Sequence, residues 1–585
     1  MTLHYLEPSK IPIYPLGWTP LASVNIYRYL LLHASSIDII QFPENSGIGY
    51  FTLLARHTGI AFQNLKIIVG LHGANVEWSS LLNKKYPTDA YGIQLGYFER
   101  RSVELADLVV SPSEYMVDYV RNRGWKIPAL SFVIPNIVSG TGLNSTTTKE
   151  IEPLNELVFF GRLEERKGIR LFVEAVELLL MADSPHPNLS INKITFLGKD
   201  HTDAKTNLQA SSLITQALRK LQLESRHPFT FSFLHSYGRA EALNYLKGGG
   251  RLTIISPLAD NSPSTVLECI EGGIRFVASE VGGIPELIRE DDWTKVLFPP
   301  TADALVRRII DTFSSSIPSL PIRPSTSTIT AAADWIQLHK WIHNSFPCSP
   351  TPVRPSTDPL VTICITHHDR PLLVKQLINS IRRQTYSNYE VILVDDGSES
   401  VEAKKYLDQL ERESMEERKG WTVRRIANSY LGEARNLGVI DAKGDYLLFL
   451  DDDDVLKPHA LRTLISVAQK TNASALSTWL DEFTTHIDPL TNSNLPHRRS
   501  YWFAGQSLSL GLLTNCFGSG NIFVRRDVFE KVGGFSTLRD VGGEDWEFYM
   551  RLAVRGYEQL VVPEELIYVR SDPAGSSMVR SSITS

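Results

Sequence analysis

The stretch GDYLLFLDDDD, residues 444–454, decides the fold of the C-terminal third of the chain. An apolar run of strand length ends there in four consecutive aspartates. Open α/β sheets bind ligands at the carboxyl ends of their strands, and adjacent carboxylates repel one another unless a cation neutralises them. Mg²⁺ and Mn²⁺ prefer carboxylate oxygens and leave positions free for phosphate oxygens. Taken alone, the run is better explained as a solvated acidic loop or a helix N-terminus.

The surrounding motifs reverse that preference. A second strand, EVILVDDGS (390–398), also ends in paired acids. GEARNLGVIDAKGDY (432–446) lies between the two strands, and GSGNIFVRRDVFEKVGGF (518–535) and GGEDWEFYMRLAVRGY (542–557) follow. This ordered set resembles glycosyltransferase family 2 across nearly all of residues 360–580. The resemblance implies an A-type nucleotide-sugar fold and an inverting, metal-dependent sugar transfer.

The same resemblance implies roles for five residues near the donor. Asp395 and Asp396 match the acids beside the nucleoside, and Arg435 matches an arginine that faces the donor. Asp451 and Asp453 match the aspartate-x-aspartate motif, which would hold Mn²⁺ or Mg²⁺ on the donor diphosphate. A bound dication would neutralise the leaving diphosphate, where charge develops during transfer.

Asp545 matches the family's general base, which must be ionised and within hydrogen-bond reach of the acceptor hydroxyl. A simpler interpretation is that Glu544 and Asp545 begin a helix and favour its dipole; the motif order favours the catalytic role. This sequence differs from the family's usual pattern at THHDRP (366–371), where the family usually has Tyr-Asn or a similar pair. His367 and His368 could be metal ligands, but we expect one to wall the nucleoside site and the other to pack or face solvent.

A second site is predicted in the middle of the chain. FFGRLEERKG (159–168) is a strand that leads through a turn into a helix, with Arg162 and Lys167 on and just after the turn. Two cations beside a helix N-terminus form an anion site that suits a diphosphate. Alone, the pair would be better explained as two surface basic residues in a charged loop.

The segment 256–288, SPLADNSPSTVLECIEGGIRFVASEVGGIPELI, supports the anion site. It carries acids at Asp260 and Glu268, and Gly282–Gly283 precede a helix where small residues allow close approach of a ligand. Together with the two cations it resembles glycosyltransferase family 4, retaining enzymes with two Rossmann-like domains facing a cleft. The resemblance implies that the cations contact the donor phosphates, Glu268 the ribose, and the glycine turn the donor. The family has glutamate where this chain has Asp260, which is one methylene shorter.

Residues 1–150 alternate strand-length apolar runs with helical patterns, which predicts parallel βαβ units. Family 4 members begin with a strand and a Gly-rich loop, and neither precedes IDIIQF (37–42). His72, in GLHGANVEW, matches a histidine of the family's first domain, although a hydrogen-bonded core histidine explains it equally well. We therefore expect a first domain without its opening βαβ units, either because the start is truncated or because the module has lost catalysis.

The predicted fold class is α/β, with two facing Rossmann-like domains followed by a single nucleotide-sugar-binding α/β domain. The predicted boundaries are a partial first domain over 1–150, a donor-binding domain with a crossover helix over 151–346, a Pro-rich linker over 347–359, and the family 2-like domain over 360–585. The linker is predicted because four prolines in twelve residues cannot form a packed element.

Composition excludes several classes of partner. The net charge of −6 argues against nucleic acid, which requires clustered Lys and Arg. The cysteines are scattered without metal-ligand spacing, so a disulfide framework and a zinc site are not expected; they are Cys269, Cys348, Cys364 and Cys516. The sequence predicts no secretory signal and no integral membrane span, and hence a cytoplasmic protein, with peripheral membrane contact left open.

The predicted function is transfer of a sugar from a nucleotide-sugar donor to a hydroxyl of a glycan, lipid-linked or protein acceptor, during glycan or polysaccharide assembly. Two modules on one chain could add successive sugars, because tethering raises effective concentration. In the alternative, the N-terminal module is a non-catalytic scaffold that presents an acceptor to the C-terminal enzyme. Neither the donor sugar nor the oligomeric state is specified by the sequence.

Overall fold

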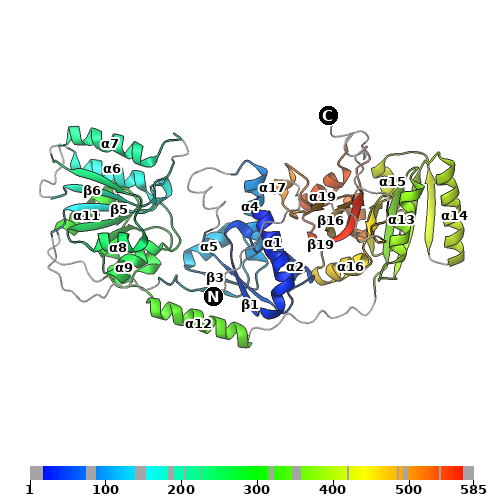
Figure 1. Ribbon diagram of the computed structural model, residues 1–585, viewed down its shortest axis with the longest axis horizontal. Helices are drawn as coiled ribbons and strands as arrows, with labels where there is room; N and C mark the ends of the chain where they lie inside the picture. Colours follow the sequence, from blue (N-terminus) through cyan, green and yellow to red (C-terminus); the bar gives the residue numbers. More distant parts are fainter. Residues whose placement is uncertain are drawn as a thin grey trace.

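The computed structural model consists of three α/β units in a row. It describes residues 18–73, 87–138, 153–181, 190–202, 206–225, 227–314, 322–345, 358–417, 420–483, 487–491, 499–538 and 542–570. The N-terminal unit, blue in Figure 1, lies between the middle unit and the C-terminal unit. The predicted α/β fold class is confirmed, but the order of the units in space is not their order along the chain.

The first unit contains a four-stranded parallel sheet with strand order β1-β2-β3-β4. Its central strands β2 and β3 are buried along nearly their whole length, which explains their nearly continuous apolar sequences. Two of its helices begin at side-chain caps, since Asp89 accepts from the backbone N–H of Gly92 and Ser113 from that of Met116. The elements are α1 (Trp18–His33), η1 (Ala34–Ser36), β1 (Ile39–Pro43), η2 (Asn45–Gly47), α2 (Tyr50–Thr58), β2 (Lys66–Gly70), α4 (Ala90–Glu104), β3 (Leu108–Ser111), α5 (Glu114–Asn122) and β4 (Ser131–Val133).

The expected absence of an opening βαβ unit concerns residues that precede β1. Of these, residues 18–38 are described and contain α1 and η1, while residues 1–17 lie outside the described part. Within the described residues, β1 is an edge strand that pairs with β2 alone.

The middle unit contains a six-stranded parallel sheet with strand order β10-β9-β8-β5-β6-β7. The order reverses between β5 and β8, and open α/β sheets bind ligands at such a switch point. The strands are β5 (Glu156–Phe160), β6 (Lys193–Leu197), β7 (Thr230–Leu234), β8 (Arg251–Ile255), β9 (Phe276–Ser279) and β10 (Leu297–Phe298). The helices are η3 (Glu165–Lys167), α6 (Ile169–Leu180), α7 (Ala210–Glu224), α8 (Arg239–Lys247), α9 (Ser264–Gly272), η4 (Pro285–Leu287), α10 (Glu290–Val296) and α11 (Ala302–Ser314).

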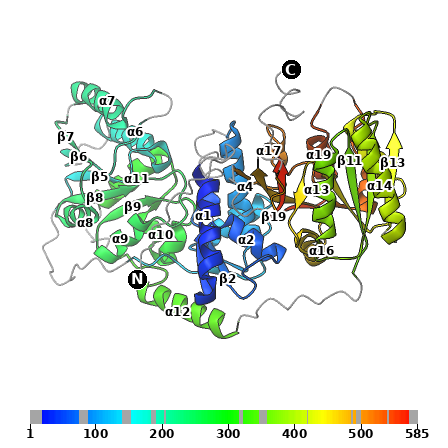
Figure 2. The ribbon, with the colours of Figure 1, turned by 45° about the vertical axis from the view of Figure 1, so that its right-hand side comes forward.

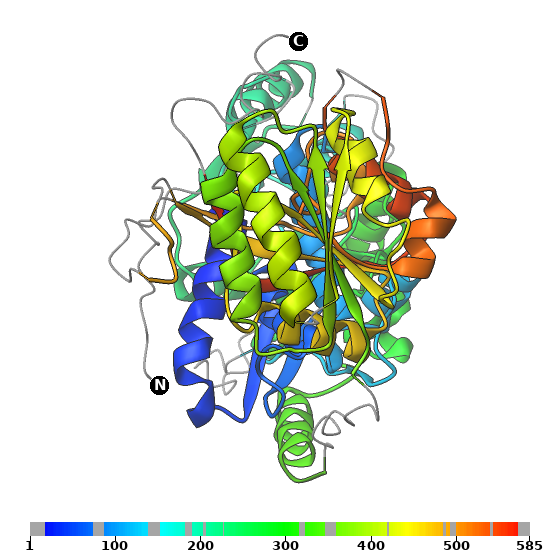
Figure 3. The same cartoon turned by 90° about the vertical axis from the view of Figure 1, so that its right-hand side faces the viewer.

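The C-terminal unit has a mixed sheet with order β13-β12-β11-β14-β18-β16-β19-β15, and β17 pairs with β16. Its first four strands are parallel, and Figure 3 shows α13 and α14 side by side across them. The strands are β11 (Val361–His367), β12 (Tyr389–Asp396), β13 (Trp421–Ile426), β14 (Tyr446–Asp451), β15 (Val455–Leu456), β16 (Ala475–Phe483), β17 (Arg499–Tyr501), β18 (Phe523–Arg525) and β19 (Gln559–Arg570). The helices are α13 (Pro371–Arg382), α14 (Val401–Glu417), α15 (Leu431–Leu437), α16 (Ala460–Thr471), α17 (Leu508–Gly511), α18 (Arg526–Val532) and α19 (Glu544–Val554).

Helix α12 (Thr328–Ser345) follows the middle unit in sequence but lies beneath the first unit (Figure 2). Leu338 and Ile342 pack in one buried cluster with Ile68, Leu108 and Val110 of the first sheet. The helix therefore holds the first unit against the end of the middle unit. Most of the predicted Pro-rich linker, residues 347–357, lies outside the described residues.

None of the helices in the described ranges is long and apolar enough to cross a membrane.

The packing of α12 on the first sheet leads to a prediction about stability. Ile342 is fully buried, so Ile342→Ala should reduce the free energy of unfolding by about 2–5 kcal/mol through lost contacts and a cavity. Ile336, on the same helix, is 56% exposed, and Ile336→Ala should change it little. Urea unfolding followed by circular dichroism measures both; equal losses in the two variants would contradict this packing.

Candidate active sites

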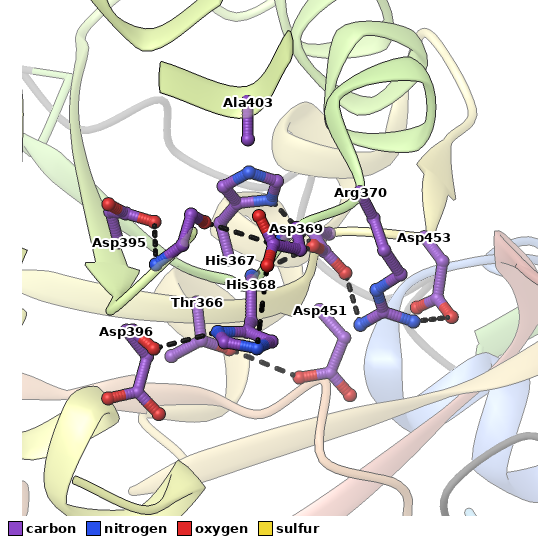
Figure 4. A network of polar contacts seen from close by, with 12 residues as sticks. Thr366, His367, His368, Asp369, Arg370, Asp395, Asp396, Ala403, Asp451 and Asp453 are labelled. Atoms are coloured by element: carbon purple, nitrogen blue, oxygen red, sulfur yellow. Dashed lines mark hydrogen bonds and ion pairs between the residues drawn. The ribbon is translucent and has the colours of Figure 1, made fainter. Parts of the chain in front are cut away.

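The carboxyl ends of β11, β12 and β14 bring the acidic motifs of the C-terminal unit together. These strands are parallel neighbours, and their register pairs His367 with Asp395 and Thr366 with Asp451. Figure 4 shows the side chains grouped at this edge of the sheet. Motifs separated by more than fifty residues in sequence therefore meet at one site, as expected for parallel strands.

Asp395 is held by the turn that follows β12, and Asp396 by the segment between β13 and α15. Asp395 is buried and accepts a hydrogen bond from the backbone N–H of Ser398 at 3.3 Å. Asp396 accepts from the backbone N–H of Ser429 at 2.6 Å and from its hydroxyl at 3.0 Å. Both carboxylates are thereby oriented before any ligand binds.

The four consecutive aspartates that begin with the last residue of β14 differ alternately in burial. Asp452 and Asp454 are buried, whereas Asp451 and Asp453 keep 26% and 23% of their side chains exposed. Asp453 forms an ion pair with Arg370 at 2.7 Å. Burial raises the pKa of Asp453 to about 6, and the neighbouring Asp451 and Asp452 add to the increase although Arg370 opposes it.

This excess of negative charge fits a divalent cation. Asp451 and Asp453 offer hard carboxylate oxygens at the edge where a diphosphate would lie. No group of three potential metal ligands occurs among the described residues. Mg²⁺ in proteins is commonly held by one or two carboxylates, with water and phosphate oxygens in the remaining positions.

Arg435 links the aspartates to helix α19. Its buried guanidinium donates to Asp451 at 2.8 Å and to Glu544 at 3.0 Å. Asp545, the next residue on α19, has its pKa raised by burial, although Arg435 opposes the increase. The residue expected to face the donor thus also holds the candidate metal acid and the candidate base helix together.

The sequence did not single out the cluster formed by His367, Arg370 and Asp452. His367 Nδ1 lies 2.7 Å from Asp452 Oδ2, and both side chains are fully buried. Arg370 forms ion pairs with both Asp452 and Asp453. His368 Nδ1 lies 2.8 Å from the backbone oxygen of Asp396, beside the expected nucleoside position. The signal that could have found the cluster is the alternation of side chains along DDDD, which turns Asp452 away from Asp451 and Asp453.

The second candidate site lies at the switch point of the middle sheet. Lys167, at the end of η3, forms an ion pair with Asp260, and Arg166 approaches the same carboxylate at 3.6 Å. Burial lowers the pKa of Lys167, although Asp260 opposes the decrease. Arg162 is 56% exposed and pairs with Glu164 at 3.1 Å. Both cations predicted to contact phosphates therefore pair with an acid, and the Arg162 side chain is the more exposed of the two.

The remaining predicted residues of this site surround the same edge. Glu268 is buried and accepts from Arg239 at 2.5 Å. Gly282 has a φ of +59°, and a Cβ on it would overlap the carbonyl oxygen of Asp260. A Cβ on Gly283 would overlap the backbone oxygen of Asn261. The close approach of the two backbones therefore requires glycine at both positions.

The carboxyl edges of the first two sheets face each other, as predicted. Asn261 donates to the backbone oxygen of Leu71 at 3.1 Å. Glu286 accepts from the first two backbone N–H groups of α5, both at 2.8 Å. His72 lies on the same side of the first sheet, and its backbone N–H donates to buried Glu44 at 2.8 Å. Burial raises the pKa of Glu44 to about 7 and lowers that of the His72 ring.

The acidic and basic side chains at these two sheet edges are those expected of a glycosyltransferase, and comparison with known proteins supports that class. Residues 362–533 match the model of "Glycosyl transferase family 2", residues 145–322 that of "Glycosyl transferases group 1", and residues 512–570 the "N-terminal domain of galactosyltransferase". The chain is therefore a fusion of a group 1 module and a family 2 module. The predicted fusion is confirmed.

Individual relatives match parts of the chain. An uncharacterized glycosyltransferase of Haemophilus influenzae is 29% identical over 205 residues, which cover 33% of this chain and 62% of the relative. An O-antigen biosynthesis protein of Myxococcus xanthus is 28% identical over 221 residues, 34% of this chain and 16% of that protein. The sucrose-phosphate synthase structure from Thermosynechococcus elongatus aligns with a TM-score of 0.41 and 16% identity, over 57% of this chain and 82% of that one.

The buried position of Arg435 leads to a second prediction. Arg435→Ala leaves Asp451 and Glu544 without their shared counter-charge, so the free energy of unfolding should fall by about 3 kcal/mol. Arg425→Ala removes an exposed ion pair with Asp408 and should cost less than about 1 kcal/mol. Urea unfolding in the presence of a chelator measures both losses. A loss for Arg435→Ala no larger than that for Arg425→Ala would contradict the bridging role.

Proposed function

We propose that the chain transfers sugars from nucleotide-sugar donors to acceptor hydroxyls during glycan or polysaccharide assembly, and that its family 2 module is inverting and metal-dependent. The observation that carries the proposal is the chain of contacts from Asp451 through Arg435 to Glu544. It joins the acids suited to a cation with the helix that carries Asp545, so the two halves of a transfer site are held at a fixed distance.

The donor half of the proposed site consists of two pairs of acids. Asp395 and Asp396 would orient the nucleoside, since hydrogen bonds from the backbone already fix their carboxylates. Asp451 and Asp453 would hold Mn²⁺ or Mg²⁺, which when bound neutralises the leaving diphosphate. The pKa of Asp453, raised first by burial and then by repulsion from Asp451 and Asp452, supports this assignment, because a bound cation would favour the ionised carboxylate.

The acceptor half is assigned to Asp545. Its carboxylate would take the proton from the acceptor hydroxyl as the oxygen attacks the anomeric carbon. The bond from that carbon to the nucleoside diphosphate breaks on the opposite side, so the configuration inverts. Burial raises the pKa of Asp545, which makes its carboxylate a stronger base than that of an exposed aspartate.

For the group 1 module we propose a retaining transfer with Arg162 and Lys167 on the donor phosphates, Glu268 on the ribose, and the Gly282–Gly283 turn beside the donor. Asp260 would stand beside the donor sugar. The ion pair between Lys167 and Asp260 supports this arrangement, since it keeps a cation at the switch point of the sheet. We propose the same domain division as the sequence indicated, with 1–150 and 151–346 forming this module and 360–585 the family 2 module.

Two substitutions in the full chain distinguish the modules. Asp453→Asn should reduce Mn²⁺-dependent nucleoside diphosphate release, measured on a panel of UDP-, GDP- and dTDP-sugars, by about a hundredfold or more, because the cation loses a ligand. Lys167→Met should leave the Mn²⁺-dependent release of the family 2 module unchanged. It should abolish the nucleoside diphosphate release that persists when a chelator is present, which we assign to the group 1 module.

Asp441→Asn is the matched control, because Asp441 is an exposed aspartate that pairs with Arg424. Release by Asp453→Asn within threefold of the unaltered chain would show that the metal assignment is wrong. If Lys167→Met changes no product and no nucleotide-sugar binding, the module is the acceptor-presenting scaffold instead of an enzyme.

The pH dependence of the family 2 reaction should report Asp545. A base acts only when ionised, and burial raises its pKa above the ordinary value of 3.8, so kcat/KM should decline as pH falls through that raised value. Profiles at two Mn²⁺ concentrations separate it from Asp453, whose protonation competes with the metal. A decline of kcat/KM at low pH whose midpoint does not change with Mn²⁺ concentration belongs to Asp545. A midpoint at or below pH 3.8 would contradict the assignment.

A further inference from the structure

The first Rossmann-like domain shares an apolar core with the family 2 module. Tyr27 and Phe51 pack edge-on against Trp479, with ring centroids 5.7 Å and 5.0 Å away. Trp479 is 1% exposed, and Tyr50 stacks on Phe98 at 4.3 Å within the same buried cluster. Figure 2 shows α2 beside β19, and α1 beside α2. Large aromatic side chains buried across the boundary make these two domains one packed body rather than tethered neighbours.

Polar contacts around this core set the orientation of the two domains. The hydroxyl of Tyr27 donates to the backbone oxygen of Pro563 at 2.9 Å. Arg28 forms an ion pair with Glu565 at 2.9 Å, and its guanidinium lies over the ring of Trp502, 4.9 Å from the centroid. The donors, Tyr27 and Arg28, lie on α1, and the acceptors, Pro563 and Glu565, lie on β19. Rotation of one domain against the other would therefore break both contacts together.

One segment of the family 2 module, residues 502–517, lies directly against the first domain. The hydroxyl of Tyr50 donates to the backbone oxygen of Ala504 at 2.6 Å. Gly505 follows with a φ of +112°, and a Cβ there would stand 2.9 Å from the hydroxyl of Tyr97 and 3.1 Å from that of Tyr50. The absence of a side chain at this position allows the segment to approach both tyrosines.

The other side of segment 502–517 supports helix α19. The indole N–H of Trp546 donates to the backbone oxygen of Gly511 at 2.8 Å. Tyr549 stacks on Phe517, with centroids 5.8 Å apart and planes 15° from parallel. Helix α19 begins with Glu544 and Asp545, so the segment lies between the first domain and the helix that carries the proposed base.

We propose that the first Rossmann-like domain positions helix α19 of the family 2 module, the helix that carries Asp545. Tyr50 and Tyr97 contact segment 502–517 directly, and Phe51 supports it through Trp479, whose ring lies 5.7 Å from that of Trp502. The segment in turn holds the start of α19. The catalytic consequence rests on the proposed function of Asp545, whereas the mechanical link does not. A base displaced by about 1 Å can lose about a hundredfold in rate, so such support bears directly on turnover.

Hydrogen exchange of the full chain, followed by mass spectrometry without substrate, tests the link. Phe51→Ala should speed amide exchange about tenfold or more in residues 505–517 and 544–554, and Phe51→Leu, which restores most of the buried volume, should return it toward normal. Phe132→Ala is the matched control. Phe132 belongs to the same domain but packs on the opposite side, against Trp341 of α12 at 5.7 Å.

Two smaller changes serve if Phe51→Ala fails to fold. Tyr50→Phe removes only the hydroxyl that binds Ala504, and Gly505→Ala inserts a methyl group against both tyrosines. Each should raise exchange in residues 544–554, whereas Tyr386→Phe, which removes a similar hydroxyl-to-carbonyl bond at Pro359, should not. Unchanged exchange in 544–554 for folded Phe51→Ala, or for both smaller variants, would overturn the proposal.

Kinetics separate positioning from general loss of stability. The folded variants should lose kcat by about tenfold in Mn²⁺-dependent nucleoside diphosphate release, while calorimetric binding of UDP or GDP with Mn²⁺ stays within twofold, because Asp395, Asp396 and Asp453 lie on other elements. Faster exchange with unchanged kcat would overturn the catalytic consequence. A failure of the proposed function would instead appear as no Mn²⁺-dependent release from the unaltered chain, with the exchange result intact.

Discussion

The buried guanidinium of Arg435 is the contact on which the family 2 site depends. It lies between Asp451, at the end of a central strand, and Glu544, at the start of α19. Without a cation between them, these acids and the neighbouring aspartates would repel one another in a partly desolvated site. One side chain therefore offsets part of the negative charge at this edge of the sheet and links the proposed metal acids to the helix of the proposed base.

The arrangement of the three units follows from a second constraint, the burial of apolar helix faces. The first unit has a helix layer that packs on the family 2 module and a sheet face that α12 covers. It thus connects to the middle unit through the facing strand ends and α12, and to the C-terminal unit through an aromatic core (Figure 1). The domain that is first in sequence becomes the central one in space, in contact with both modules.

Sequence reasoning was most effective where chemistry falls at strand ends. Asp395 and Asp451 could be predicted to converge, because the carboxyl ends of parallel strands share one edge of a sheet. The cluster of His367, Arg370 and Asp452 could not, since it depends on which side chain of the acidic run turns inward. Likewise, the sequence indicated Asp260 only as a residue near the sugar donor, whereas in the fold it forms an ion pair with Lys167.

The sequence by itself determined the identity and order of the modules, because strand periodicity, acidic strand ends and glycine turns are local patterns that each domain needs in order to fold. Only the tertiary structure decided that Trp479 is buried against Phe51, and that Tyr50 reaches the backbone beside the helix of Asp545. These contacts join residues more than four hundred positions apart and carry no spacing signal. An aromatic residue in a strand has the same local pattern whether it faces its own core or a neighbouring domain.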